Sequence, residues 1–579
     1  MKFFCEIILI YVIHSVFSLR FIPEEFQKPF LQVHTNNGIV QGTRLKSDNY
    51  RSGYYYAYMG IPYAQPPLGQ LRFRAPKSAG NWSGVLDARR EGSACIEMWL
   101  RIVTPTRVVG TEDCLFINIF AKKNPRKYKR LSPVMVYIYG GAFMEGNSDI
   151  TFYGPELLVS KDVIVVTFNY RIGIFGFLNT GDLASPGNYG LKDQNMALQW
   201  IQQNIRNFGG DPDSVTLFGQ SAGSVSVHFH MLSPKSKGLF HRAILESGTA
   251  LCHWGSQRMP RNLAYLVGLA NGITKPKDSQ DLIERLRQID SEDLKVTQIG
   301  PTFAILGTAL RTGLPYSPSI EPDHEDAFIS RDYWYDMLKN GDFNQVPVLM
   351  GLNANESVFF HRVISLAKPF LIGYDIDPSF QTPPAMNISN HTAAVEVGEI
   401  IRQFYLGPNG KFSKADLNDL IEFTNHDYFT RPIHKSASLM AKHIPLYYYY
   451  FSYEGILSRD GLPEDSKHKE IRGVGHLEET FYIFNKEGNI SKLKTDYLVR
   501  ERMLKLWTNF AKYGNPTPTR EELLNNLLWP TVSPLEGQKM EYLEINETLS
   551  LRDSFNEDIY IQWWEDMFRK YAVPPFRNY

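Results

Sequence analysis

The sequence predicts an α/β fold with a large, mostly parallel central sheet that helices cover on both faces. The first observation is a set of short runs that are almost continuously apolar or aromatic, as expected of strands buried on both faces. These runs lie at residues 134–139, 163–168, 215–218, 243–245, 347–350 and 446–453. The second observation is that helical patterns alternate with the runs, which is typical of the α/β class.

Two of these helical patterns are clear. Four apolar side chains at helical spacing form one stripe, Met196, Trp200, Ile201 and Ile205. The glycine pair at 209–210 should end that helix. A second helix is predicted over 498–510, and the Gly-Asn-Pro sequence at 514–516 should stop it.

Composition limits the class of protein. The 579 residues are 43% hydrophobic and carry 61 basic against 61 acidic side chains, so nothing indicates a nucleic-acid partner. No Pro/Ser/Gly-rich linker, charge block or internal repeat divides the chain. We therefore expect one large catalytic domain rather than several small ones.

The first residues resemble a secretion signal. Lys2 precedes an apolar run at 3–17, and Ser18 is an acceptable cleavage site. We expect residues 1–18 to be a signal peptide and 19–579 to be the catalytic domain, with no membrane span in the mature chain; an uncleaved anchor is the alternative. N-glycosylation acceptors, which suit a secreted protein, occur at Asn81, Asn387, Asn390, Asn489 and Asn546.

The mature chain keeps three cysteines. Cys5 would leave with the signal peptide, and Cys95, Cys114 and Cys252 allow one disulfide and one free thiol. A bridge between Cys95 and Cys114 would close a short loop and stabilise the fold by roughly 3 kcal/mol. Cys252 would then be a buried, inert thiol.

The most informative segment, residues 208–223, reads FGGDPDSVTLFGQSAG. A buried strand ends there in a G-x-S-x-G sequence, whose small residues suit a tight turn that exposes the Ser221 hydroxyl. The alternative is an ordinary Gly-rich turn without a catalytic role. The apolar residues that follow alternate in strand fashion, at 225, 227, 229 and 231. We nevertheless predict a helix after Ser221, because its N-terminus would supply a dipole and a free N–H beside the serine.

Partners for Ser221 occur farther along the chain. Glu356 follows the strand at 347–350, and His476 lies in a Gly-rich loop after the Tyr-rich strand. Taken alone, each would be read as a solvated loop residue, yet the order serine, acid, histidine is that of the α/β-hydrolases. Backbone donors for an oxyanion are expected in the glycine-rich loop at 139–143, which follows the strand at 134–139, and at the N–H of Ala222.

Several motifs together resemble the type-B carboxylesterases, a cholinesterase-like family of α/β-hydrolases. They lie at 66–69 (PPLG), 71–73 (LRF), 112–115 (EDCL), 169–171 (NYR), 187–194 (GNYGLKDQ), 219–223 (GQSAG) and 246–248 (ESG). The resemblance implies Ser221 as nucleophile, Glu356 as acid and His476 as base. It also implies Gly141, Ala142 and Ala222 as oxyanion donors. A Cys95–Cys114 disulfide is implied as well, with Ser247 as a buried serine that supports the triad. Arg72 with Glu112, and Arg171 with Asp193, match structural ion pairs.

Several residues differ from the family's usual pattern, and these differences narrow the kind of esterase that is expected. Ala142 replaces a glycine, Gln220 replaces the glutamate of cholinesterases, and Thr104 stands where they carry a choline-stacking tryptophan, with Trp99 elsewhere in the loop. This pattern is more similar to secreted insect carboxylesterases, including juvenile-hormone-esterase-like enzymes. We predict a secreted serine esterase that hydrolyses small-molecule carboxylic esters through an acyl-enzyme, without metal or cofactor. A non-catalytic adhesion or binding ectodomain of the same fold is the alternative.

Overall fold

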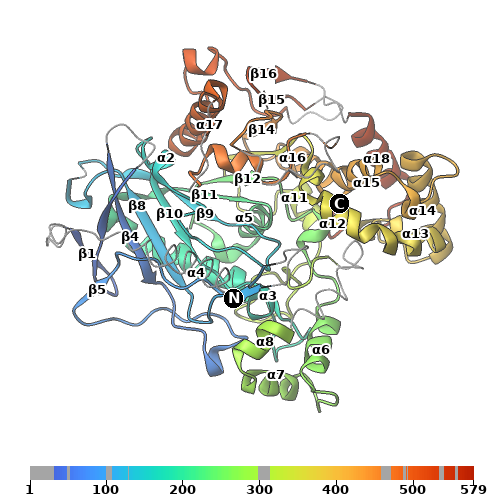
Figure 1. The fold of residues 1–579 in the computed structure, drawn as a ribbon, viewed down its shortest axis with the longest axis horizontal. Coiled ribbons are helices and arrows are strands. Elements are labelled where there is room, and N and C mark those ends of the chain that lie inside the picture. Colours follow the sequence, from blue (N-terminus) through green and yellow to red (C-terminus); the bar gives the residue numbers. More distant parts are fainter. Residues whose placement is uncertain are drawn as a thin grey trace, which may run out of the picture.

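A central sheet of eleven strands organises the molecule (Figure 1). The computed structural model describes residues 31–47, 53–99, 107–127, 129–297, 313–457, 471, 473–486, 491, 493–533, 540–553 and 558–579. Its strand order is β16-β15-β14-β13-β12-β11-β9-β10-β8-β4-β3. The predicted signal peptide at 1–18 and the sequence motif position Thr104 lie outside the described residues.

The middle of the sheet is parallel and consists of the strands that the apolar runs predict. These strands are β9 (Ser132–Ile138), β10 (Ile164–Phe168), β11 (Gly210–Gln220), β12 (Arg242–Glu246), β13 (Val348–Asn353) and β14 (Leu446–Phe451). Every residue of β10, β13 and β14 is buried. The predicted mostly parallel sheet is therefore confirmed, with strand ends that differ from the predicted ones by a few residues.

Further strands, most of them paired antiparallel, extend the sheet on both sides. On one side lie β8 (Phe116–Ala121), β4 (Tyr54–Pro62) and β3 (Thr43–Lys46). On the other, β15 (Tyr542–Ile545) pairs parallel with β14, and β16 (Leu549–Arg552) pairs antiparallel with β15. A small sheet of β1 (Gln32–Thr35), β2 (Gly38–Gln41) and β5 (Val85–Asp87) lies beside them.

Helices cover both faces of the sheet (Figure 1). Helices α2 (Glu156–Val159) and α17 (Lys494–Tyr513) contact each other on one face, while α4 (Tyr189–Asn204) and α5 (Ala222–Leu232) cover the other. The two predicted helices are thus confirmed as α4 and α17. The helix predicted after Ser221 is also confirmed. All residues of α5 are buried, so no polar face marks it as helical in the sequence.

Further α-helices complete the described part of the fold. Their bounds are α3 (Gly173–Phe177), α6 (Pro260–Ala270), α7 (Ser279–Gln288), α8 (Ser291–Thr297), α11 (Trp334–Asn340), α12 (His361–Ala367), α13 (Ile372–Ile376), α14 (His391–Leu406), α15 (Leu417–Asn425), α16 (Arg431–Met440) and α18 (Asp558–Tyr571). Among the described residues, we find no helix that is both long and apolar enough to cross a bilayer.

Glu91, in the loop between β5 and β6 (Glu97–Trp99), makes stability sensitive to pH. Burial, followed by the nearby Asp149 carboxylate, raises the pKa of Glu91 to about 8. An unfolded glutamate ionises near pH ~4.3, so between that value and pH 8 ionisation favours the unfolded chain. The contribution of Glu91 to stability is therefore lost progressively as the pH rises through this window.

Glu91→Gln tests this effect. Glu91 accepts a hydrogen bond from the Ile150 N–H at 3.1 Å. Glutamine keeps an oxygen for this bond but cannot ionise. The melting temperature of the variant relative to wild type should be higher at about pH 7.5 than at about pH 5. Calorimetry at both pH values checks this, with exposed Glu541→Gln as a control for the substitution itself. An equal difference at both pH values would show that Glu91 ionises normally.

Candidate active site

Ser221 lies on a sharp turn between β11 and α5. Its φ of 58° and ψ of −125° are unusual for a residue with a side chain. The neighbouring glycines make the turn possible, because a Cβ on Gly223 would lie 2.0 Å from the Ile138 carbonyl oxygen. A Cβ on Gly219 would lie 2.7 Å from the Gly223 carbonyl carbon. The small residues of the G-x-S-x-G sequence are thus required by close backbone packing.

Backbone hydrogen bonds fix this turn to the sheet. The Ser221 N–H donates to the Glu246 carbonyl at 2.9 Å, and the Ser221 carbonyl accepts the Val225 N–H at 2.9 Å in the first turn of α5. Ser221 itself is half-buried rather than enclosed. A strained serine held rigidly at the carboxyl edge of a parallel sheet is the expected geometry of a nucleophile elbow.

The predicted acid and base contact each other beside this turn. His476 Nδ1 lies 2.6 Å from Glu356 Oε2, and the His476 N–H donates to the Glu356 carbonyl at 3.1 Å. Glu356 is fully buried and its Oε1 accepts the Asn353 N–H at 2.7 Å. The solvated-loop interpretation of Glu356 is therefore wrong. With Nδ1 bonded to the carboxylate, Nε2 is the nitrogen left to exchange a proton with a substrate or nucleophile.

Gln220 links the histidine to the elbow. Its Nε2 lies 3.3 Å from His476 Nε2, and it directly precedes Ser221 in the chain. The structure therefore brings the three predicted triad residues to one edge of the sheet, from the ends of β11 and β13 and from the loop after β14.

The predicted oxyanion loop follows β9 and lies against Ser221. Gly141 has a φ of 106° and Ala142 a φ of 55°, so the loop turns sharply away from the strand. The N–H groups of Gly141 and Ala142 have no acceptor within the described chain. Ala222 begins α5, and the first N–H groups of a helix are not used by its own hydrogen bonds. These amides are free to bind a developing negative charge.

Two further carboxyl groups lie buried behind the histidine. Glu246 accepts a hydrogen bond from Trp507 Nε1 at 2.6 Å, and Glu479 bonds the side chain of Asn353. Burial raises the pKa of both carboxyls. Protonated, they add no negative charge beside Glu356. Glu479 and Asn353 were not among the predicted site residues, although each lies three residues from a triad member.

Ser247 is fully buried at the end of β12, as predicted for a supporting serine. Its N–H donates to the Gly351 carbonyl at 3.0 Å, while its Oγ has no hydrogen-bond partner in the described chain. A supporting role for its hydroxyl thus stays a prediction.

Aromatic rings surround His476 and were not predicted. The centroids of Phe429, Phe360 and Phe359 lie 4.9, 5.5 and 6.1 Å from the imidazole centroid. Phe359 and Phe360 follow Glu356 by three and four residues, so the sequence could have indicated these two rings. These rings give the site an apolar, aromatic lining.

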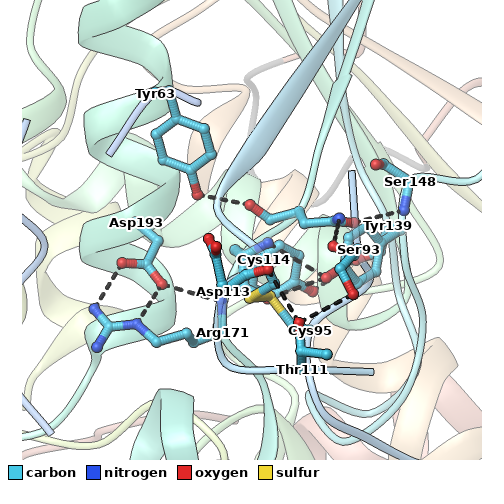
Figure 2. Close-up of a disulfide and its surroundings, with 12 residues drawn as sticks. Tyr63, Ser93, Cys95, Thr111, Asp113, Cys114, Tyr139, Ser148, Arg171 and Asp193 are labelled. Atoms are coloured by element: carbon cyan, nitrogen blue, oxygen red, sulfur yellow. Dashed lines mark hydrogen bonds and ion pairs between the residues drawn. A yellow bond between two sulfur atoms is a disulfide. The ribbon is translucent and has the colours of Figure 1, made fainter. Parts of the chain in front are cut away.

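The predicted disulfide is present, and an ion pair fixes the region beside it (Figure 2). Cys95 and Cys114 are bonded, with their Cα atoms 4.8 Å apart. Nearby, Arg171 pairs with Asp193 at 2.7 Å, and both side chains are buried. Arg72 pairs similarly with Glu112, with Nε to Oε2 at 2.7 Å. Cys252 is a buried free thiol, and burial raises its pKa to about 12, which disfavours the reactive thiolate.

The glycosylation acceptors differ in accessibility. Asn81, Asn387 and Asn390 are exposed, whereas Asn489 lies outside the described residues. Asn546 is half-buried and its Nδ2 donates to Ser452. A glycan on Asn546 would replace a proton of that amide, so the three exposed asparagines are the better acceptors.

Comparisons with known proteins agree with this geometry. Residues 29–563 match the carboxylesterase family. Juvenile hormone esterase of Tribolium castaneum is 33% identical over 89% of this chain and 88% of its own length. Venom carboxylesterase-6 of Apis mellifera is 31% identical over 95% and 96%. The crystal structure of juvenile hormone esterase from Manduca sexta, with OTFP covalently attached, superposes with a TM-score of 0.79 at 28% identity, covering 93% of this chain and 99% of that one.

The chain therefore belongs to the carboxylesterase family and has the α/β-hydrolase fold. Its relatives support a serine esterase that hydrolyses carboxylic esters, and the non-catalytic alternative is not favoured.

Gly140→Ala tests the close packing between the oxyanion loop and the elbow. A Cβ at Gly140 would lie 2.6 Å from the Gln220 carbonyl oxygen and 3.0 Å from Ser221 Cβ, so either the loop or the serine must shift. Loss of one oxyanion donor alone lowers kcat by about 10²-fold or more, and we expect at least that loss here. Gly80→Ala, whose Cβ would meet open space, is the matched control. Unchanged kcat in folded Gly140→Ala protein would contradict the described packing.

Proposed function

We propose that Ser221, Glu356 and His476 form the catalytic triad of a secreted esterase that acts on small-molecule carboxylic esters. The observation that carries the proposal is the buried contact between His476 Nδ1 and Glu356 Oε2 beside the Ser221 turn. A buried acid that orients an imidazole next to an exposed serine is the arrangement that serine hydrolases use to activate the hydroxyl.

In the proposed reaction, His476 Nε2 takes the proton of Ser221 Oγ while the oxygen attacks the ester carbonyl carbon. The carbonyl oxygen becomes an oxyanion and accepts hydrogen bonds from the amides of Gly141, Ala142 and Ala222. The carbon–oxygen bond to the alcohol then breaks, and His476 returns its proton to the leaving alcohol.

Water releases the acyl group by the same steps. His476 removes a proton from the water, whose oxygen attacks the acyl-enzyme, and the proton then returns to Ser221 as the acid leaves. Glu356 keeps the imidazole oriented and stabilises its positive charge in both halves of the reaction. All proton transfers use this chain's own side chains.

The substrate class is proposed from the site and the relatives. The apolar rings beside His476 favour lipophilic esters, and the likeness to two juvenile hormone esterases makes a lipophilic hormone ester a candidate. Secretion is proposed on the apolar run at 3–17 before Ser18, which suggests that the mature domain begins at residue 19.

Ser221→Ala should abolish ester hydrolysis and leave the fold intact, because only a half-exposed hydroxyl is lost. Residual kcat should fall below about a thousandth of wild type, the usual scale for loss of a triad nucleophile. Mass spectrometry of wild type after reaction with an organophosphate should find one modification, on Ser221, and none in the variant. Labelling of another residue, or full activity in the variant, would overturn the assignment.

Substrate charge provides a second test. A desolvated aromatic face holds a quaternary ammonium by roughly 2 kcal/mol, and the sequence has Thr104 where cholinesterases have that ring. Short nitrophenyl or naphthyl esters should therefore show a clearly higher kcat/KM than acetylthiocholine. Preference for acetylthiocholine, reduced by Trp99→Ala, would show that Trp99 supplies the missing aromatic face.

A further inference from the structure

A second concave surface lies far from Ser221, at the opposite end of the sheet. It is a groove of about 900 Å³, bordered by the chain after α5, by residues 327–331 and by α11. Its floor includes half-buried apolar side chains, among them Ala327, Phe343 and Val346. Pockets that enclose small organic ligands measure about 300–1,000 Å³ and have mostly apolar walls. This groove has the size and floor of a ligand site.

The sheet itself separates the groove from the triad. Pro347 borders the groove immediately before β13, whereas Asn353, which holds Glu356, ends that strand. The six residues of β13 rise about 3.3 Å each, so they span roughly 20 Å. Helix α5 gives the same separation, because Ser221 precedes its first residue and Leu232, its last, borders the groove.

The rim of the groove carries unpaired positive charge. Lys237 and Arg331 both border it, are exposed, and form no ion pair among the described residues. The one acidic residue that borders the groove, Asp342, follows α11, whereas Arg331 precedes it. His241 also borders the groove; its Nδ1 accepts the Val215 N–H, and burial lowers its pKa, so it stays neutral near pH 7. The groove is thus bordered by two exposed cations and one carboxylate.

We propose that this groove is a second ligand site and that it binds an amphiphilic carboxylate. The alkyl chain would cover the apolar floor, where burial of each CH₂ is worth about 0.8 kcal/mol in principle. The carboxylate would pair with Lys237 and Arg331. Carboxylic acids are also the products that ester hydrolysis releases, but the site requires no contribution from Ser221.

Binding of dodecanoate to Ser221→Ala protein tests the proposal without turnover. Calorimetric titration should show saturable binding of one molecule. The double variant Lys237→Glu/Arg331→Glu, made in the Ser221→Ala background, should weaken it at least about tenfold, because both cations become repulsive. Lys275→Glu, an exposed lysine before α7, is the matched control and should bind as before. Dodecanol, which lacks the charge, should bind more weakly than dodecanoate.

A second variant keeps the test independent of charge. Ala327→Trp should fill the groove and abolish binding, with circular dichroism and the melting temperature verifying the fold. Absence of saturable binding would overturn the proposal. So would binding that both groove variants leave unchanged, because the ligand would then lie elsewhere, for instance beside His476. Because no step uses catalysis, these results are distinct from a failure of the proposed esterase function.

Discussion

Close packing of three backbone segments around Ser221 is the constraint on which the site depends. The ends of β9 and β11 and the start of α5 share a volume that admits no side chain at Gly140, Gly219 or Gly223. Ser221 is held there with a positive φ, a strain of about 1–3 kcal/mol. The complete burial of α5 stabilises the surrounding structure enough to maintain it.

The parallel sheet brings the acid and the base to the same edge as the serine. Carboxyl ends of parallel strands lie at one edge, so residues far apart in sequence meet there. Asn353 closes β13 and binds Glu356, while Glu246 closes β12 and accepts the Ser221 N–H. The buried Glu356–His476 contact then joins the chain that follows β13 to the chain that follows β14. A single edge thus positions nucleophile, acid and base with little contribution from the outer helices.

Much of this could be predicted from the sequence, for physical reasons. Strands buried on both faces are apolar throughout, which made β9 to β14 recognisable, and the glycine spacing identified the elbow. The strands β3, β4, β8, β15 and β16 were not predicted. Exposure mixes polar with apolar residues in β3 and β16, whereas β8 was missed although it is almost wholly buried. The alternation at 225–231 was misleading since a helix buried all round lacks a polar stripe. Glu356 resembled a solvated loop residue because burial depends on contacts with Asn353 and His476 that local sequence cannot show.

The most direct test of the account is a crystal structure of the enzyme inhibited by a trifluoromethyl ketone, which mimics the tetrahedral intermediate. The account predicts a covalent bond from Ser221 Oγ to the carbonyl carbon. It also predicts the oxyanion within about 3 Å of the Gly141, Ala142 and Ala222 amides and His476 Nε2 beside the Ser221 oxygen. A ketone bound through another residue, or an oxyanion directed away from these amides, would contradict it.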